Sequence, residues 1–333
     1  MDAVQRVLVI VSLSVAAGCA SHRVSGTPRA AVPLPADLRQ YYSYPPSETT
    51  AVVRVSEQHS SYSVKDVSLS APGSSKPIQI VWYAPVASGL HPLILISPIR
   101  GSDTLIVDGC AEVFAARGYH AAIVKRLHSD FDPAGPLSQV EDSLRTAVIR
   151  HRQALDWLVK QPGVDVNRVG TLGISYGGII NAALAAVEPR AKACVIDLAG
   201  GPLAGVMKSS DEHSVRRDWR RSRRCHDLTN RELYNALQQV VQTDPVKLAP
   251  YVASDRVLML IARFDRSVPT PYQLKLWRAL GKPRADFVPL GHYTSILALP
   301  THRSRILRFF EEAFARPASV ALADRPLGIS LRQ

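Results

Sequence analysis

The chain has 333 residues, of which 46% are hydrophobic and 20% charged, enough apolar side chains for the buried core of one large or two ordinary domains. This composition excludes an intrinsically disordered chain. The net charge of +12 points to an acidic partner, but the excess is uneven, because residues 208–231 hold eight Lys or Arg against four acidic residues.

The first segment has the pattern of an export signal. In residues 1–19, MDAVQRVLVIVSLSVAAGC, Arg6 precedes an apolar run that ends at Gly18, too short to span a bilayer and typical of a secretory signal. The small residues before Cys19 resemble a bacterial lipoprotein signal, which implies that Cys19 is acylated and becomes the N-terminus. Ala20 in the next position resembles the outer-membrane-sorted group. A cleaved signal without acylation and an uncleaved anchor are the alternatives.

We therefore expect the protein in the bacterial cell envelope, lipid-anchored at the outer membrane on its periplasmic side or at the surface, or else periplasmic or secreted. A nucleic-acid partner is not expected for an exported chain without a binding motif. After Cys19 three cysteines remain, an odd number without a closely spaced pair, so neither a disulfide framework nor a zinc site is expected.

Residues 20–59 are rich in Pro, Ser and small residues and show no periodic apolar face, which predicts a flexible tether. Two β-rich segments follow at residues 62–71 and 76–85, separated by PGSSK, which predicts a hairpin. HPLILISP at residues 91–98 is a short continuous apolar run, typical of a strand buried on both faces.

From there, predicted strands and helices alternate. We expect helices near residues 108–117, 138–160, 177–187, 272–280 and 306–314, and strands near 119–126, 167–175, 191–201, 255–265 and 285–291. This alternation predicts an α/β fold with a mostly parallel central sheet flanked by helices. We expect the domain to extend over residues 60–316 and residues 317–333 to form a C-terminal tail.

One segment interrupts the alternation. After the sixth expected strand, residues 198–255 are far longer than a simple connection, so we expect a helical lid over about residues 201–250 at the carboxyl edge of the sheet. The lid contains the basic stretch of residues 208–231. It is either a solvated basic face or a surface for the anionic headgroups of a membrane.

The sequence GISYGG at residues 173–178 has the form G-x-S-x-G between a predicted buried strand and a helix of small residues. A sharp strand-to-helix turn would present the hydroxyl of Ser175 above the sheet, and Gly173 and Gly177 leave room for such a turn. Ser175 is therefore the candidate nucleophile.

A serine nucleophile needs a histidine base and a carboxylate that orients the base. Asp265 and His292 follow two later strands, in the order Ser, acid, His, and each stands at the carboxyl end of a strand, as Ser175 does. Asp197, also at a strand end, is the second candidate for the acid. The donors to an oxyanion should be the backbone N–H of Tyr176 and one from the loop SPIRGSD, where Ile99 or Arg100 is expected. The Arg100 side chain either meets a substrate anion or faces solvent.

GISYGG, ARFDRSVP and PLGHY together resemble the α/β-hydrolase family over roughly residues 60–316. The WYAP and PLILISP segments are similar to those of dienelactone-hydrolase-like and acetylhydrolase-like esterases. Dienelactone hydrolases use cysteine where this chain has Ser175, which argues against that substrate. The His-Gly that usually begins the oxyanion loop is replaced by Ser97-Pro98, so the donor in this loop stays open.

These observations predict an exported serine hydrolase that cleaves carboxylic esters through an acyl-enzyme, with a small-molecule or lipid ester as substrate. No metal or organic cofactor is required. A peptidase or acyltransferase on the same three residues is the nearest alternative. A non-catalytic hydrolase-fold binding protein of the envelope is the alternative from another class.

Overall fold

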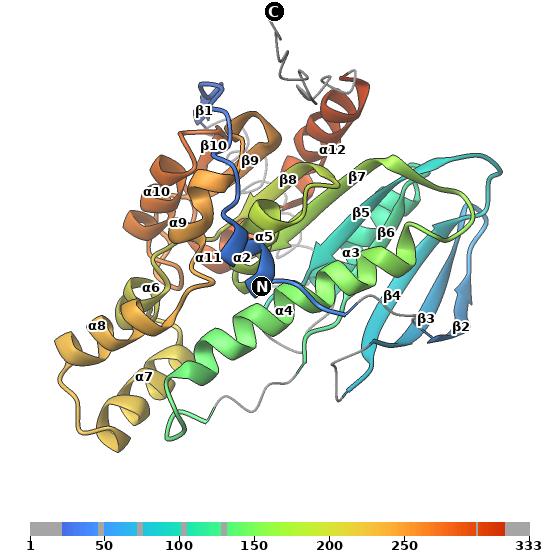
Figure 1. The fold of residues 1–333 in the computed structure, drawn as a ribbon. Coiled ribbons are helices and arrows are strands. Elements are labelled where there is room, and N and C mark those ends of the chain that lie inside the picture. The colour runs from blue at the N-terminus through green and yellow to red at the C-terminus, as the bar shows by residue number, and fades with distance from the viewer. Residues whose placement is uncertain are drawn as a thin grey trace, which may run out of the picture.

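The computed structural model describes residues 22–45, 50–71, 76–100, 105–127, 132–297 and 299–316. The expected signal segment with Cys19 and the tail of residues 317–333 lie outside the described residues. The strands form one sheet in the order β1-β10-β9-β8-β7-β5-β6-β4-β3-β2 (Figure 1). Their bounds are β1 His22–Val24, β2 Thr50–Gln58, β3 Tyr62–Ser70, β4 Ile78–Pro85, β5 His91–Ser97, β6 His120–Val124, β7 Val164–Ile174, β8 Ala191–Asp197, β9 Val257–Ala262 and β10 Arg284–Val288.

The six strands from β10 to β6 are parallel to one another, and the pairs at both edges of the sheet are antiparallel. In register, Leu95 of β5 stands opposite Ala122 of β6 on one side and Thr171 of β7 on the other. Continuous apolar runs form these central strands because both faces of the sheet are covered. The mostly parallel sheet and the hairpin of β3 and β4 are as the sequence predicts.

Helices cover both faces. Their bounds are α2 Ala36–Tyr41, α3 Leu105–Ala115, α4 Ser138–Leu158, α5 Tyr176–Val187, α6 Leu203–Ser209, α7 His213–Cys225, α8 Asn230–Val240, α9 Pro245–Leu248, α10 Thr270–Ala279, α11 His292–Leu297 and α12 Leu299–Ala315. Helices α4, α5 and α10 contribute to the core on one face, and α3 and α12 to the core on the other. In Figure 1, α4 crosses in front of the sheet and α3 lies behind it.

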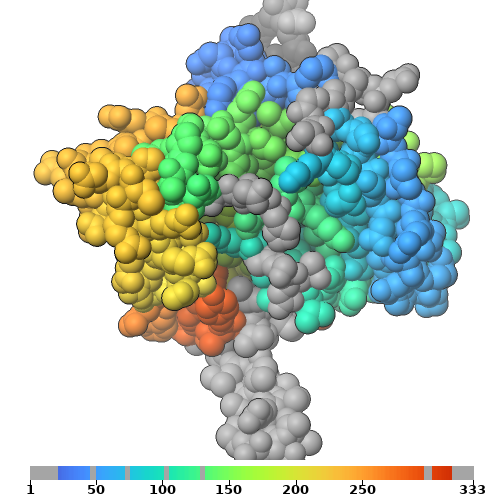
Figure 2. Space-filling model, turned by 90° about the horizontal axis from the view of Figure 1, so that it is seen from below, coloured from blue at the N-terminus to red at the C-terminus, as the bar shows by residue number. Residues whose placement is uncertain are grey.

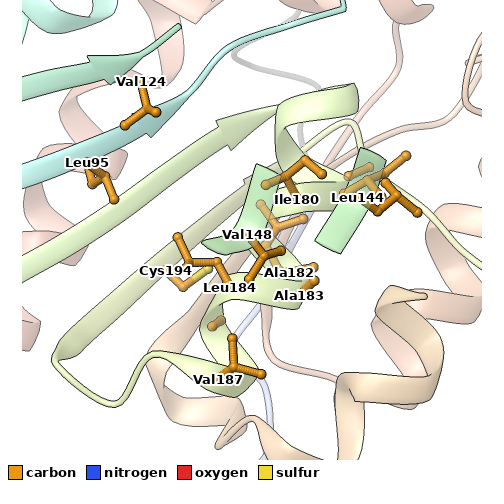
Figure 3. Packing of buried hydrophobic residues seen from close by; sticks show 14 of the residues in the cluster. Leu95, Val124, Leu144, Val148, Ile180, Ala182, Ala183, Leu184, Val187 and Cys194 are labelled. Atoms are coloured by element: carbon orange, nitrogen blue, oxygen red, sulfur yellow. The ribbon is translucent and has the colours of Figure 1, made fainter. Parts of the chain in front are cut away.

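Side chains of β5 alternate between the two cores, as the pleat of a strand requires. Leu93 and Leu95 face the helices α4 and α5, whereas Ile94 and Ile96 face α3 and α12. Figure 3 shows the first of these cores, in which Val148 of α4 lies among side chains of α5 and Leu95 lies beside Val124 of β6. Small residues of α5 allow this helix to lie close to the sheet.

The expectation of a flexible tether over residues 20–59 is wrong for the described part of that stretch. Strand β1 pairs with β10, and β2 pairs with β3 along its length. Between them the Arg29 guanidinium donates to the carbonyl oxygens of Ala249, Val252 and Ala279 at 2.7–3.1 Å. A Pro-rich segment can therefore be held by hydrogen bonds to a folded neighbour without an apolar face of its own.

The segment between β8 and β9 folds into α6, α7, α8 and α9, which form a lobe at one side of the molecule (yellow in Figure 2) next to α4 (green). Trp219, Leu233 and Leu237 of this lobe are buried in the core on the α4 face. The lobe follows the strand that the sequence counts as sixth, since the prediction omitted β1 and β2. Its helices are packed on the domain rather than extended from it.

Candidate active site

Ser175 is the single residue between β7 and α5 and has φ of 57°. Its N–H donates to the carbonyl oxygen of Asp197 at 2.8 Å, which fixes the turn to the end of β8. A Cβ on Gly177 would collide with the carbonyl oxygen of Ser97. A left-handed conformation at a residue with a side chain costs energy and is kept where it serves a function. The turn is the sharp one that presents a side chain above the sheet.

The side chains of Ser175, His292 and Asp265 meet at the carboxyl edge of the sheet. His292 Nε2 lies 2.9 Å from Ser175 Oγ, and His292 Nδ1 lies 2.7 Å from Asp265 Oδ2. An ionised carboxylate only accepts hydrogen bonds, so Nδ1 carries the proton and Nε2 is free to accept from the Ser175 hydroxyl. The geometry is that of a nucleophile, a base and an orienting acid.

The acid is held by groups that the sequence prediction missed. Asp265 Oδ1 accepts from the N–H of Val268 at 2.9 Å, and Oδ2 accepts from Gln273 Nε2 at 2.8 Å. Gln273 is fully buried, and its Oε1 accepts from the N–H of Ala262 at 3.2 Å. The only signal in the sequence is the helix expected at residues 272–280, which in the structure begins at Thr270 and keeps its first turns near Asp265.

Asp197, the second candidate for the acid, does not hold His292. Its side chain is buried, and its Oδ2 has no hydrogen-bond partner within the described residues. Burial, together with the charge of Asp265, raises the pKa of Asp197 to about 8. Of the two carboxyl groups, only that of Asp265 contacts His292.

On the other side of Ser175 lies the expected oxyanion loop. Tyr176 is the first residue of α5, where a backbone N–H has no acceptor within the helix. Ile99 packs its side chain against the core of α3 and α12. The Arg100 side chain donates to the Asp218 carboxylate of α7 at 2.7 Å. The backbone carbonyl oxygen of Arg100 accepts a hydrogen bond from the Arg126 side chain at 2.6 Å. Residues 101–103 of this loop lie outside the described part of the chain.

The Arg100 side chain is therefore held by the lobe. The sequence predicted that it either binds a substrate anion or faces solvent, and neither prediction included its contact with Asp218. Its pairing with Asp218 ties the oxyanion loop to α7. The sequence could not predict this contact, because the two residues are 118 positions apart.

A cavity of about 290 Å³ adjoins the turn at Ser175 and is lined by Ser97, Tyr176 and Gly177 together with residues of α4 and the end of β6. Ser97 Oγ lies 3.0 Å from His151 Nε2, and His151 Nδ1 lies 2.7 Å from the carbonyl oxygen of Ala147. Since a carbonyl only accepts, Nδ1 carries the proton and the Ser97 hydroxyl donates to Nε2. Burial lowers the pKa of His151 to about 4, so its ring is neutral at pH 7. This pair, missed by the sequence prediction, fixes the end of β5.

The described residues hold no candidate metal cluster and no candidate membrane-spanning helix. They contain no cluster of three or more His, Cys, Asp or Glu side chains that could hold a metal ion. None of the described helices is both long and apolar enough to cross a bilayer.

Comparison with known proteins gives one family match. The model of the X-Pro dipeptidyl-peptidase family (S15) matches residues 27–270, a range that includes Ser175 and Asp265 and ends before His292. No curated protein matches the chain by sequence.

Solved structures share the fold. Acetyl xylan esterase 1 from Thermoanaerobacterium sp. JW/SL YS485 is 18% identical over 87% of this chain and 96% of its own, with a TM-score of 0.63. The acetyl xylan esterase from Paenibacillus sp. R4 is 18% identical over 83% of this chain and 92% of its own, with a TM-score of 0.60. The acylaminoacyl peptidase of Pyrococcus horikoshii is 17% identical over 77% of this chain and 42% of its own, with a TM-score of 0.55.

Proposed function

The chain belongs to the X-Pro dipeptidyl-peptidase family (S15) and is a hydrolase with the α/β-hydrolase fold, and from this premise we propose that it cleaves carboxylic esters through an acyl-enzyme. The observation that carries the proposal is the continuous chain of hydrogen bonds from Ser175 Oγ through the His292 ring to Asp265. A hydroxyl at such a turn becomes nucleophilic only when a base stands ready to take its proton.

In the first half of the reaction, Ser175 Oγ attacks the ester carbonyl while its proton passes to His292 Nε2. The negative charge then on the carbonyl oxygen is stabilised by backbone N–H groups, for which we propose Tyr176 and Ile99 or Arg100. The bond to the alcohol breaks, and His292 returns the proton to the departing oxygen. Asp265 stays ionised and stabilises the imidazolium. In the second half, water adds to the acyl-enzyme with His292 again as base, the bond to Ser175 Oγ breaks to release the carboxylic acid, and His292 returns the proton to Ser175 Oγ.

A peptidase that releases X-Pro dipeptides is the second candidate, favoured by the description of the family. Such an enzyme must bind the free α-ammonium group of its substrate close to the nucleophile, which calls for carboxylates. The cavity beside Tyr176 is lined by Lys125, Arg126 and Arg150 and by one exposed carboxylate, Asp142. This excess of positive charge disfavours an ammonium group and supports the ester hydrolase.

Both candidates use the same three residues, so a substrate panel separates them. We expect hydrolysis of acetyl and butyryl esters of a fluorescent alcohol, lost in Ser175→Ala, and at most trace cleavage of an Ala-Pro anilide. Faster cleavage of the anilide than of the esters would establish the peptidase instead. If an added alcohol captures the acyl group in preference to water, the enzyme is an acyltransferase. A non-catalytic binding protein would turn over none of these.

For the location of the protein, we propose export to the bacterial envelope and attachment through an acylated Cys19, with α7 turned to the membrane surface. The support is the sequence of residues 1–19 and the exposed arginines at 216, 220 and 224, which lie four residues apart on one face of α7. The ion pairs of α7 with described residues use Arg217, Asp218 and Arg221, so that face is left for anionic headgroups.

A further inference from the structure

The cavity beside Tyr176 and the base His292 lie on opposite sides of the nucleophile. His292 follows β10, Ser175 follows β7, and the cavity lies at the ends of β5 and β6, which come after β7 in the sheet order. His292 must protonate the departing alcohol, so the alcohol part of an ester lies toward β10. The acyl part then extends the other way, toward the cavity.

The polar groups that line this cavity are incompletely paired. Arg126 Nε and Gln139 Oε1 are both buried without a hydrogen-bond partner in the part of the chain that the structure describes. A buried donor without a partner is costly, and the Arg126 Nε–H beside Ser175 suggests that an acceptor oxygen of a ligand completes it, whereas Gln139 Oε1 is an acceptor and would take a donor. Arg126 also forms no ion pair with a described carboxylate.

The other lining groups add one more buried charge, and it is positive. Arg150 adds a second guanidinium, which is buried and donates to the carbonyl oxygens of Lys76 and Pro77. Lys125 and Asp142 are exposed, so water screens their effects. The guanidinium of Arg126 lies over the Tyr176 ring, 5.0 Å from its centre, which places a positive charge directly beside the nucleophile turn.

We propose that this cavity binds the acyl part of the substrate and selects acyl groups that end in a carboxylate, with Arg126 as the residue that recognises the anion. The inference rests on the proposed ester hydrolase activity and names its substrate class. A guanidinium with a free N–H is suited to a carboxylate oxygen, since a charge-assisted hydrogen bond is stronger than a neutral one.

The size of the cavity fits such a group. About 290 Å³ is at the low end of small-molecule sites, whereas an acetyl group alone would leave most of this volume to water. A succinyl group has the four carbons of a butyryl group, with a carboxylate in place of the terminal methyl. The pair of succinyl and butyryl esters therefore isolates the effect of the charge.

The test compares kcat/KM for the succinyl and butyryl monoesters of the same fluorescent alcohol. We expect the wild type to prefer the succinyl ester, and Arg126→Gln to lower the ratio of the two values by about tenfold or more. Gln139→Glu, which keeps the volume and places a negative charge in the cavity, should lower the same ratio. Arg117→Gln changes the net charge equally at an exposed site before β6, at the opposite end of this strand from Arg126, and should leave the ratio at the wild-type value.

A binding measurement separates failure of the pocket from failure of the proposed function. Calorimetric titration of succinate into the wild type and into Arg126→Gln needs no turnover, and we expect weaker binding to the variant. The proposed carboxylate pocket would be wrong if wild type, Arg126→Gln and Gln139→Glu all had the same succinyl-to-butyryl ratio of kcat/KM and the same affinity for succinate. Loss of all ester hydrolysis with succinate binding that still depends on Arg126 would contradict the ester hydrolase and support the pocket.

Discussion

Gln273 donates its side-chain N–H to the same Asp265 oxygen that accepts the hydrogen bond of His292, with Nε2 at 2.8 Å from Oδ2. A second bond from the same nitrogen reaches the Val268 carbonyl oxygen at 2.8 Å and fixes the amide. We therefore expect Gln273 to act as a positioning residue that orients the proposed acid, Asp265.

Replacement of Gln273 by Met keeps the volume and removes the donor. We expect kcat to fall by about tenfold while KM stays near the wild-type value, because the change affects the orientation of the base and not the binding of the ester. Steady-state kinetics measure both constants, and Gln161→Met, at an amide that bonds only Trp157 in the described structure, is the control. An unchanged kcat in Gln273→Met would show that the Asp265 carboxylate is held without this bond.

The second prediction concerns the close contact between Gly177 and the oxyanion loop. A Cβ at this position would strike the carbonyl oxygen of Ser97, so Gly177→Ala has to move either the nucleophile turn or the oxyanion loop. We expect kcat/KM to fall by about 100-fold, the scale of a lost oxyanion donor. Gly109→Ala, where the added Cβ meets nothing within 4 Å, should keep full activity. Equal rates for the two variants would mean that the turn tolerates the shift.

The raised pKa of Asp197 should make the stability of the folded chain depend on pH. Its pKa is about 8 in the folded chain against an ordinary value of 3.8. Below about pH 4 the Asp197 carboxyl is protonated in both the folded and the unfolded chain and does not lower the free energy of unfolding. As the pH rises toward 8, this carboxyl ionises first in the unfolded chain, so the free energy of unfolding falls. Asp197→Asn should therefore raise the free energy of unfolding relative to the wild type at pH 8, by on the order of a few kcal/mol, and not at pH 4.

Urea unfolding at the two pH values measures this difference. Asp37→Asn, at an exposed site on α2, should show no such pH-dependent gain. If Asp197→Asn changes stability by the same amount at pH 4 and pH 8, the carboxyl of Asp197 is not the group that resists ionisation.

The exposed arginine face of α7 predicts binding to anionic vesicles. The triple variant of residues 216, 220 and 224 to Gln should lose most of the affinity of the purified domain, since each basic residue near such a surface contributes about 1 kcal/mol. Sedimentation with vesicles, with and without anionic lipid, measures this, and high salt should weaken binding by the wild type. Binding that ignores both salt and lipid charge would rule out the arginine face as the contact.

The sequence predicted the sheet and the meeting of Ser175, Asp265 and His292 for one physical reason. Each of the three follows the carboxyl end of a strand, and parallel strands bring these ends to one edge. The contacts of Gln273 and His151 could not be predicted, because they depend on which face of a helix packs toward the sheet. Strand β2 was missed although three valines stand within residues 52–55, since the Pro and Ser residues around it outweighed that signal.

The local sequence likewise gives no reason for residues 22–24 to form strand β1. It has three residues and pairs with β10, more than 250 positions away, so only the completed sheet edge gives it a partner. The bonds of Arg29 to three carbonyl oxygens fix the connection that follows. Sequence periodicity describes elements that bury an apolar face, and this segment is held by polar contacts instead.

The central claim is that Ser175 is a nucleophile activated by His292, and covalent labelling tests it most directly. A fluorophosphonate probe incubated with the wild type, Ser175→Ala and His292→Ala should give one labelled site per chain in the wild type, identified by mass spectrometry as Ser175. We expect no label in Ser175→Ala and a rate lowered by at least about 1000-fold in His292→Ala. Labelling at another residue, or at an equal rate without His292, would contradict the account.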